Sequence, residues 1–502
     1  MLSISVLQIN ATRGAFQANA EKISEASLRA KEEGANLLVA PLGALSGYPV
    51  GSYARRVEFL LRQKAALVEL SKKLAVPALF GMVPGLVFMN EGKARFVVPG
   101  EVLEIAGSHV GVLTGLDALE ENLADLKRNG ADVVVIAAAN EYRKDRPAER
   151  IAVARKAAAK AGLSLLFVNL VGGADQSVFD GASFAVNAAG NLTALLESCA
   201  ECFTTVNPTT APTIEEPKHD SLGELYSALS LALSDYVQKN GFNAVQIGLS
   251  GGVDSALVAT IATDALGADA VHALMMPTQF TADLSLTEAE KLAKNLGIDY
   301  KVRPIGPLFE SYRKELSEDF AGLAWDATEE NLQARIRGNL LMAYANKFKR
   351  LVIATSNKSE SAAGYATLYG DTVGAFEAIS DVYKTEVWAL CRWRNAKAGT
   401  ELIPQSIIDR APSAELREGQ KDSQSLPEYD VLDAVLNLYV EEGFSVSEIV
   451  KRGFDQTLVE RIVRMTHTAE FKRRQCPIGA KVSKRAFSDA SWNYPMTIKL
   501  KD

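Results

Sequence analysis

The stretch Ser250-Gly251-Gly252-Val253-Asp254-Ser255 lies between an apolar segment at 244–249 and a helical pattern at 255–265. The apolar segment predicts a buried strand, so the stretch predicts a glycine-rich turn from this strand into a helix. Such a turn directs backbone N–H groups and the positive helix end at an anion, and glycine lets phosphate oxygens approach the backbone. The hydroxyls of Ser250 and Ser255 can donate to phosphate, and Asp254 can hold a cation. We therefore predict a phosphate loop, the alternative being a turn without a ligand.

The sequence around this loop has the pattern of an α/β domain. A predicted helix at about 222–239 precedes it, and a predicted strand at 270–275 follows it and completes a parallel unit. Residues 430–502 read as helical and then basic. The alternation predicts a doubly wound parallel sheet, with further elements expected as helix 287–296, helix 329–348, strand 351–354 and helix 381–394.

The first 200 residues predict a second α/β domain. Residues 2–9 alternate like a strand, residues 21–33 are helical in pattern, and residues 36–40 form an apolar strand. Similar signals follow as strands at 78–83, 110–113, 132–137 and 164–169, a helix at about 147–161 and a hairpin within 182–197.

A change of composition separates the two halves. Residues 203–220 hold three prolines and several threonines without periodicity, which is typical of a linker. We place the domain boundary near 205, which predicts domains at 1–205 and 221–502 with a linker at 206–220.

Composition excludes several classes of protein. Apolar residues make up 48% and charged residues 23%, which excludes a disordered chain. The net charge of −7 provides no basic field for a nucleic acid, and no apolar run is long enough to span a membrane. Four cysteines cannot form a disulfide framework, and the N-terminus lacks the features of a signal peptide. We expect a soluble, cytoplasmic protein.

Several further motifs carry a family resemblance. The phosphate loop lacks the Gly-Lys-Ser/Thr ending of kinase P-loops. It resembles the loop of the ATP pyrophosphatase superfamily, which implies an adenine nucleotide α hydrolase-like fold. Together with it, the chain resembles NAD synthetases that carry a fused amidase domain, through the stretches Asn331-Leu332-Gln333-Ala334-Arg335-Ile336-Arg337, Ala354-Thr355-Ser356-Asn357-Lys358-Ser359-Glu360, Gly364-Tyr365-Ala366-Thr367-Leu368-Tyr369-Gly370-Asp371 and Asp381-Val382-Tyr383-Lys384-Thr385-Glu386.

The resemblance implies a reaction and a set of ligands. Nicotinic acid adenine dinucleotide would be adenylated by ATP, with Mg²⁺ as cofactor, and ammonia would then displace AMP to give NAD. Asp254 and Lys384 would be catalytic, and Asp254 and Glu360 would hold Mg²⁺. The implied ATP-binding residues are Gly248, Ser250, Gly251, Gly252, Val253, Asp254, Ser255, Thr355, Lys384 and Ser413. The implied dinucleotide-binding residues are Arg335, Tyr365, Thr367, Asp371 and Lys472.

Plainer interpretations of these residues stay open. Arg335 could be a solvated helix arginine and Lys384 a surface lysine, while Glu360 could contact the substrate instead of a metal. Lys472 lies in a basic run in which Phe471 stands where the family often has histidine. The pair Cys199 and Cys202 is a lone C-x-x-C without a second pair, so we do not predict a zinc site.

The first domain resembles the nitrilase/amidase fold, an α-β-β-α sandwich, but lacks its chemistry. In fused synthetases this domain hydrolyses glutamine with a Glu–Lys–Cys set. Here Leu42 stands in place of the glutamate, Gly115 in place of the cysteine, and Leu116 in place of the glutamate after it. Lys93 is the one lysine between Leu74 and Leu126, and its assignment as the lysine of the Glu–Lys–Cys set stays open. Since a nucleophilic amidase needs an activated thiol or hydroxyl, we predict an inactive amidase domain.

Three functions are compatible with these observations. The first is an ammonia-dependent NAD synthetase, the second a synthetase supplied with ammonia by a separate glutaminase, and the third a non-catalytic sensor of the NAD pathway. The resemblance further implies a homodimer or a larger homo-oligomer acting on small-molecule substrates, without nucleic acid or membrane partners.

Overall fold

The computed structural model describes residues 2–488, 492 and 494–497 of the chain. It divides into two compact units, residues 1–228 and 229–502, and the division falls within helix α5 (Ser221–Lys239). The domain limits expected from the sequence therefore stay a prediction. Among the residues that the structure describes, none of the helices has both the length and the apolar content to span a bilayer.

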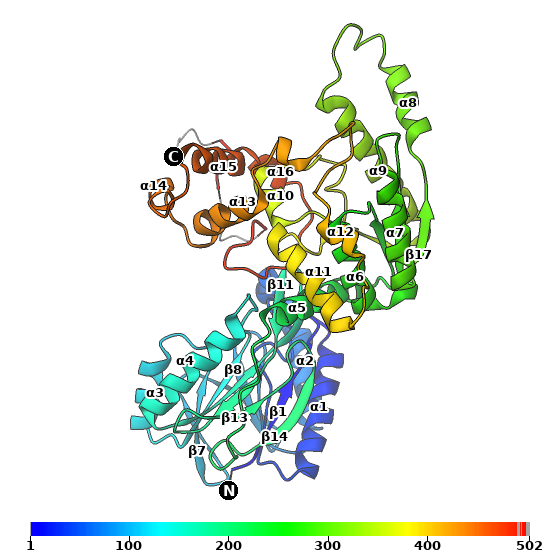
Figure 1. The fold of residues 1–502 in the computed structure, drawn as a ribbon. Helices are drawn as coiled ribbons and strands as arrows, with labels where there is room; N and C mark the ends of the chain where they lie inside the picture. The colour runs from blue at the N-terminus through cyan, green and yellow to red at the C-terminus, as the bar shows by residue number, and fades with distance from the viewer. Residues whose placement is uncertain (1, 489–491, 493, 498–502) are drawn as a thin grey trace. The chain divides into compact units, whose positions relative to one another are not determined.

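The first unit contains two six-stranded sheets (Figure 1). One has the order β14-β1-β2-β3-β4-β5, with bounds Cys202–Val206, Ile4–Gln8, Leu37–Val39, Ala78–Gly81, Leu86–Asn90 and Lys93–Val97. The other has the order β13-β12-β9-β8-β7-β6, with bounds Leu192–Leu195, Phe184–Val186, Ser164–Asn169, Val133–Ala138, Ser108–Leu113 and Val102–Ile105. A separate hairpin pairs β10 (Val171–Ala174) with β11 (Ser177–Asp180).

The two sheets pack face to face between two layers of helices. In β8, Val133 and Val135 belong to the core between the sheets, whereas Val134 and Ile136 belong to the core beneath α3 (Leu119–Arg128) and α4 (Arg146–Ala161). Helices α1 (Phe16–Glu32) and α2 (Val57–Ser71) cover the outer face of the other sheet. Because both faces of each sheet are covered, its central strands are apolar throughout. The expected α-β-β-α sandwich is confirmed.

The second unit is built on a five-stranded parallel sheet of order β17-β16-β15-β18-β19. The bounds of these strands are Asp299–Val302, Val271–Met275, Val245–Gly248, Leu351–Ala354 and Phe376–Glu377. Connections leave β15 first towards β17 and later towards β19, and right-handed crossovers then place helices on both faces. The expected doubly wound parallel sheet is therefore confirmed.

Helices surround this sheet and form a small cluster beside it. The helices of the sheet region are α6 (Val253–Leu266), α7 (Asp283–Leu296), α8 (Gly306–Glu315), α9 (Ala327–Phe348), α10 (Lys358–Ala363), α11 (Lys384–Ala398) and α12 (Gln405–Asp409). A helical cluster follows as α13 (Tyr429–Leu436), α14 (Val446–Val450), α15 (Gln456–Thr468) and α16 (Glu470–Arg473), so the helical part of the expectation for 430–502 is confirmed where the structure describes it.

Several expectations from the sequence need correction. Helix α1 begins at Phe16, five residues earlier than expected. Residues 203–206, the start of the stretch with linker-like composition, belong to β14, which pairs antiparallel with β1. Helix α11 begins at Lys384 and not at 381, because the Asp381 carboxylate accepts hydrogen bonds from the backbone of Val482 and Ser483 and keeps this segment outside the helix. Helix α7 begins four residues earlier than expected, at Asp283. Strands β4, β5, β6, β10, β11, β17 and β19 and helices α2, α3, α8, α10 and α12 were not predicted.

Candidate active site

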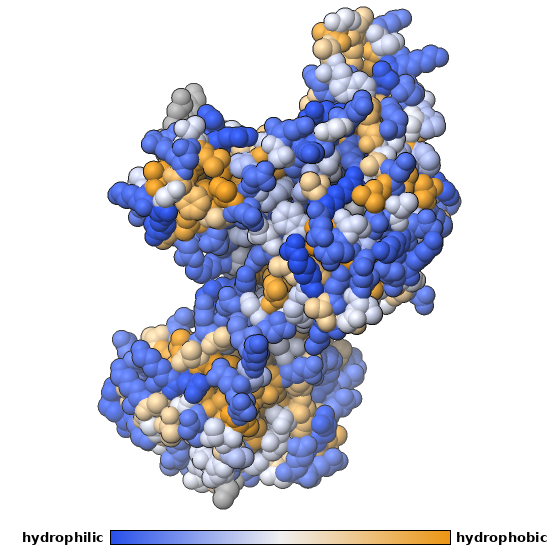
Figure 2. Space-filling view, in the orientation of Figure 1, coloured by the Kyte–Doolittle hydropathy of each residue, from blue (hydrophilic) through white to orange (hydrophobic). Residues whose placement is uncertain are grey.

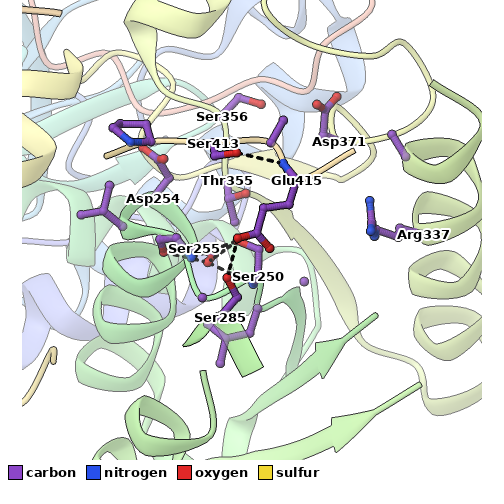
Figure 3. A pocket seen from close by; sticks show the side chains of 18 of the residues that line it. Ser250, Asp254, Ser255, Ser285, Arg337, Thr355, Ser356, Asp371, Ser413 and Glu415 are labelled. Atoms are coloured by element: carbon purple, nitrogen blue, oxygen red, sulfur yellow. Dashed lines mark hydrogen bonds between the residues drawn. The ribbon is translucent and has the colours of Figure 1, made fainter. Parts of the chain in front are cut away.

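The order of the parallel sheet determines where a ligand can bind. Chain connections reverse direction between β15 and β18, and ligands of doubly wound sheets bind beyond the carboxyl ends of the strands at such a point. The loop after β15 is the predicted phosphate loop, and the loop after β18 begins at Thr355. Both loops line one pocket, which is shown in Figure 3.

Hydrogen bonds within the phosphate loop hold its hydroxyl groups in place. Ser255 is buried, and its Oγ accepts from the backbone N–H of Ser250 at 3.2 Å and donates to the carbonyl of Gly252 at 3.0 Å. Ser250 Oγ lies 3.1 Å from Ser255 Oγ and accepts from the N–H of Gly252 at 3.2 Å. Helix α6 begins within this stretch, at Val253, so its positive end adds to the potential that this loop presents to an anion.

Asp254, Lys384 and Glu360 form a charged cluster at one side of the pocket. Lys384 Nζ donates to Asp254 Oδ2 at 2.5 Å and to Glu360 Oε1 at 3.1 Å, although 130 residues separate Lys384 from Asp254. Burial alone would lower the pKa of Lys384, but the two carboxylates outweigh it and raise that pKa above its ordinary value. Burial raises the pKa of Glu360 against the opposing effect of Lys384. Lys384 is thus a buried ammonium group and not a surface lysine.

Neighbouring side chains fix this cluster from two sides. Asn357 caps helix α10 by accepting from the N–H of Glu360 at 3.0 Å, and its Nδ2 donates to Asp254 Oδ1 at 2.8 Å. The next residue, Lys358, is fully buried and forms ion pairs with Asp381 and Glu441. Helix α10 is therefore held from inside the protein while its first turn faces the pocket.

The opposite wall contains a carboxylate that faces the phosphate loop. Glu415 Oε1 accepts hydrogen bonds from Ser285 Oγ at 2.8 Å and from Arg410 Nη2 at 2.7 Å. Ser413 Oγ donates to the carbonyl of Gln420 at 2.6 Å and accepts from the N–H of Glu415 at 3.3 Å. Figure 3 shows Ser285 and Glu415 close to Ser250, with Asp254 on the left and Arg337 on the right of the pocket.

Comparison with known proteins shows the family to which the chain belongs. A family model described as NAD synthase matches residues 225–476, a range that contains every residue of the pocket. The chain belongs to the NAD synthase family. It is 37% identical to the glutamine-dependent NAD(+) synthetase of Acinetobacter baylyi over 97% of this chain and 96% of that protein. It is also 37% identical to the glutamine-dependent NAD(+) synthetase of Thermotoga maritima, over 100% of this chain and 99% of that protein.

A solved structure of the family extends the likeness to both units. The glutamine-dependent NAD+ synthetase of Acinetobacter baumannii, in complex with adenosine diphosphate, has a TM-score of 0.75 and 33% identity. The match covers 99% of this chain and 98% of that chain. The chain therefore has the fused architecture of this NAD synthase structure.

The pocket brings together most of the residues that the sequence singled out. It is lined by Gly248, Ser250, Gly251, Gly252, Val253, Asp254, Ser255, Thr355, Glu360, Tyr365, Asp371, Lys384 and Ser413. The pocket-lining residues do not include Arg335, Thr367 or Lys472. Arg335 is exposed and donates from Nε to the carbonyl of Leu368, and Lys472 Nζ donates to the carbonyls of Gly364 and Ala366 at 2.8 Å. The roles of these three residues stay predictions.

Other pocket residues were missed by sequence reasoning. These include the charged residues Arg337, Arg410, Glu415 and Asp422 and the hydroxyl residues Thr281, Ser285 and Ser356. Arg337 was part of a quoted motif, and its position two residues after Arg335 places the two side chains on different sides of one helix. Asp422 is buried, its Oδ2 accepts from Tyr429 at 2.9 Å, and burial raises its pKa.

The residues at the positions expected for amidase chemistry lie in the following environments. Leu42 is partly buried against the core between the two sheets, and Leu116 packs against the core beneath α3 and α4. A Cβ added to Gly115 would meet only Asp117 Oδ2, at 3.8 Å. Lys93 is exposed on the edge strand β5.

All four cysteines of the chain are free, and none is activated. Burial raises the pKa of Cys199 to about 12 and that of Cys476 to about 12, and it also raises the pKa of Cys202 and Cys391. Because the thiolate is the nucleophilic form, such thiols are poor nucleophiles at neutral pH.

Replacing Gly251 by alanine should destabilise the phosphate loop. Gly251 has φ +82°, and a Cβ there would lie 2.5 Å from the backbone oxygen of Ser285. The left-handed conformation alone costs about 1–2 kcal/mol for a residue with a Cβ. We expect the melting temperature to fall by several degrees, measured by differential scanning calorimetry. Gly252→Ala is the matched control, because its Cβ would meet only Ser250 Oγ, at 3.4 Å. Equal melting temperatures for the two variants would contradict the prediction.

Proposed function

We propose that this chain is an NAD synthetase that amidates nicotinic acid adenine dinucleotide to NAD. In the first step, the nicotinate carboxylate attacks the α-phosphorus of ATP, and pyrophosphate leaves. In the second step, ammonia adds to the carbonyl carbon of the acyl-adenylate, a proton is lost and AMP leaves. The single observation that supports this function best is the Asp254–Lys384–Glu360 cluster beside the phosphate loop of a chain in the NAD synthase family.

The residues of the pocket suit the build-up of negative charge on departing pyrophosphate. The positive N-terminal end of α6, which lies within the loop from Ser250 to Ser255, would attract the phosphates. Lys384 remains charged, and burial away from water strengthens its interaction with an anion. Since Asp254 and Glu360 hold the ammonium group in place, little reorganisation is needed when the charge develops.

The charges of the pocket also fit a magnesium ion bound together with ATP. Five carboxylates and three cationic side chains line the pocket, so a polyphosphate needs a further cation there. The Oδ1 atom of buried Asp422 has no hydrogen-bond partner within the described residues. Those residues contain no group of three side chains able to hold a metal, which fits Mg²⁺ held by one or two carboxylates and phosphate oxygens. Asp254 and Glu360 would hold it, and it would neutralise charge on the phosphates.

We further propose free ammonia as the nitrogen donor, with an inactive amidase unit. Both curated relatives named above are called glutamine-dependent, so this chain would differ from them in its nitrogen supply. Support comes from the apolar packing of Leu42 and Leu116, the glycine at 115 and the raised pKa of every cysteine. If a separate glutaminase supplied the ammonia, the reaction catalysed by this chain would be the same.

Product analysis tests the synthetase proposal. Purified chain with ATP, Mg²⁺, the dinucleotide and an ammonium salt should form NAD, AMP and pyrophosphate in equal amounts, measured by mass spectrometry. Omission of the ammonium salt should stop NAD formation. Absence of all three products from a folded protein would favour the non-catalytic sensor.

We also propose that the chain acts as a homo-oligomer. Exposed apolar side chains gather on α8 and the segment after it, seen at the top of Figure 2, and they include Leu308, Tyr312, Phe320, Leu323 and Trp325. Large exposed apolar patches are typical of interaction sites between proteins. Light scattering coupled to gel filtration should give at least the mass of a dimer.

A further inference from the structure

Arg337 differs from the other cationic side chains of the pocket. Lys384 is paired with two carboxylates, and Arg410 is paired with Glu415. Within the part of the chain that the structure describes, Arg337 has no ion pair, and its one hydrogen bond runs from Nε to the carbonyl of Met276 at 2.9 Å. The terminal nitrogens of its guanidinium group are therefore available to a ligand.

The surrounding backbone fixes the position of Arg337. Its neighbour Gly338 packs so closely that a Cβ there would lie 2.9 Å from the carbonyl oxygens of Tyr369 and Gly370. The bond to Met276 attaches the side chain to the segment just after β16. Arg337 is thus held on the β16 side of the phosphate loop, at the right of Figure 3. Lys384 instead bonds Glu360 of α10, the helix that follows β18.

Burial disfavours the charged form of the Arg337 side chain. Burial lowers its pKa to about 10, and Glu415 and Asp371 oppose this shift without forming an ion pair with it. The group remains cationic at neutral pH. A partly desolvated guanidinium without a counter-ion is stabilised when an anion binds, and its planar fork suits phosphate oxygens.

We propose that Arg337 binds a phosphoryl oxygen of a bound substrate, either ATP or the dinucleotide. This inference rests on the proposed function and adds to it a binding residue on the β16 side of the pocket. Arg337 contacts the ligand through its terminal nitrogens, while Nε keeps the bond to Met276. A methionine at this position retains the apolar length of the side chain and removes all the donors.

Calorimetric titration of folded Arg337→Met with ATP and, separately, with the dinucleotide tests the proposal. A charge-assisted hydrogen bond contributes about 1.5–3 kcal/mol, so Kd should rise about 10- to 100-fold for the ligand that Arg337 contacts. A rise for ATP alone assigns its phosphates, and a rise for the dinucleotide alone assigns the dinucleotide phosphates. Arg337→Lys should give a smaller increase, since it keeps the charge but loses the fork.

A control on the same helix separates binding from stability. Lys347→Met removes an exposed charge from α9 away from the pocket and should leave both Kd values unchanged. The melting temperature of Arg337→Met without ligand should stay close to that of the wild type, while the rise caused by the contacted ligand should shrink. Unchanged Kd values for both ligands in a folded Arg337→Met protein would overturn the proposal. Failure of the wild type to form NAD, with Kd values still sensitive to Arg337, would count against the synthetase function alone.

Discussion

Asp254→Ala should lower the rate of NAD formation at least about 10²- to 10³-fold, the loss typical of removing one preorganised electrostatic group from an active site. Asp254 binds Lys384 at 2.5 Å and accepts from Asn357 at 2.8 Å. Its removal leaves Glu360 as the one carboxylate on Lys384 and withdraws a proposed oxygen ligand of Mg²⁺. Charge balance is thus lost where pyrophosphate departs. The rate is measured by mass-spectrometric detection of NAD.

The fold should survive this change, because Asp254 lies at the pocket surface and Lys384 keeps its bond to Glu360. A circular-dichroism spectrum like that of the wild type is therefore expected. The matched control is Asp264→Ala at the other end of α6, where Asp264 pairs with Arg394 outside the pocket. This control should turn over within about twofold of the wild type, since surface substitutions usually change little. Wild-type turnover in a folded Asp254→Ala protein would contradict the assignment.

Sequence patterns predicted the central elements of both units because those elements are buried on both faces. Strand β9 and strand β18 have the predicted limits, since a short continuous apolar run with clear ends is typical of a fully buried strand. Strand β14 was not recognised as a strand. It pairs with β1, which lies about 200 residues earlier in the sequence, and the prolines after β14 make the local sequence pattern typical of a loop. Polar or short strands such as β5 and β17 are stabilised by their neighbours in the sheet and not by their own composition.

In the site, too, local sequence patterns predicted neighbouring residues but not contacts between residues that are distant in the sequence. The phosphate loop is local, so its spacing alone indicated Ser250, Asp254 and Ser255. The ion pair between Asp254 and Lys384 joins residues 130 positions apart, and only family resemblance linked them. Arg335 and Arg337 are equivalent in sequence, and the packing of Gly338 against the turn at 369–370 decides which one faces the pocket.

Glutamine should give no NAD above the level from contaminating ammonia, whereas an ammonium salt should support full turnover by the purified chain. Neither Leu42 nor Gly115 can act as a base or a nucleophile, and burial disfavours the thiolate of every cysteine. Since only neutral ammonia has a free lone pair, the rate at fixed total ammonium should rise as pH rises through the mildly alkaline range. The measurement is NAD formation with glutamine freed of ammonia by an ammonia-consuming enzyme.

The proposed inactive amidase unit also predicts that an electrophilic glutamine analogue leaves the first unit unlabelled. Intact-mass analysis before and after treatment measures this directly, and turnover with ammonium should be unaffected by the analogue. A thiol with a pKa near 12, as at Cys199, is almost entirely protonated at pH 8 and reacts slowly. Release of glutamate from glutamine by the purified chain, at a rate equal to NAD formation, would refute the inactive-amidase proposal. Thr114 and Cys199 would then be the first residues to replace, because Thr114 adjoins the glycine at the nucleophile position and Cys199 is a buried thiol of the same unit.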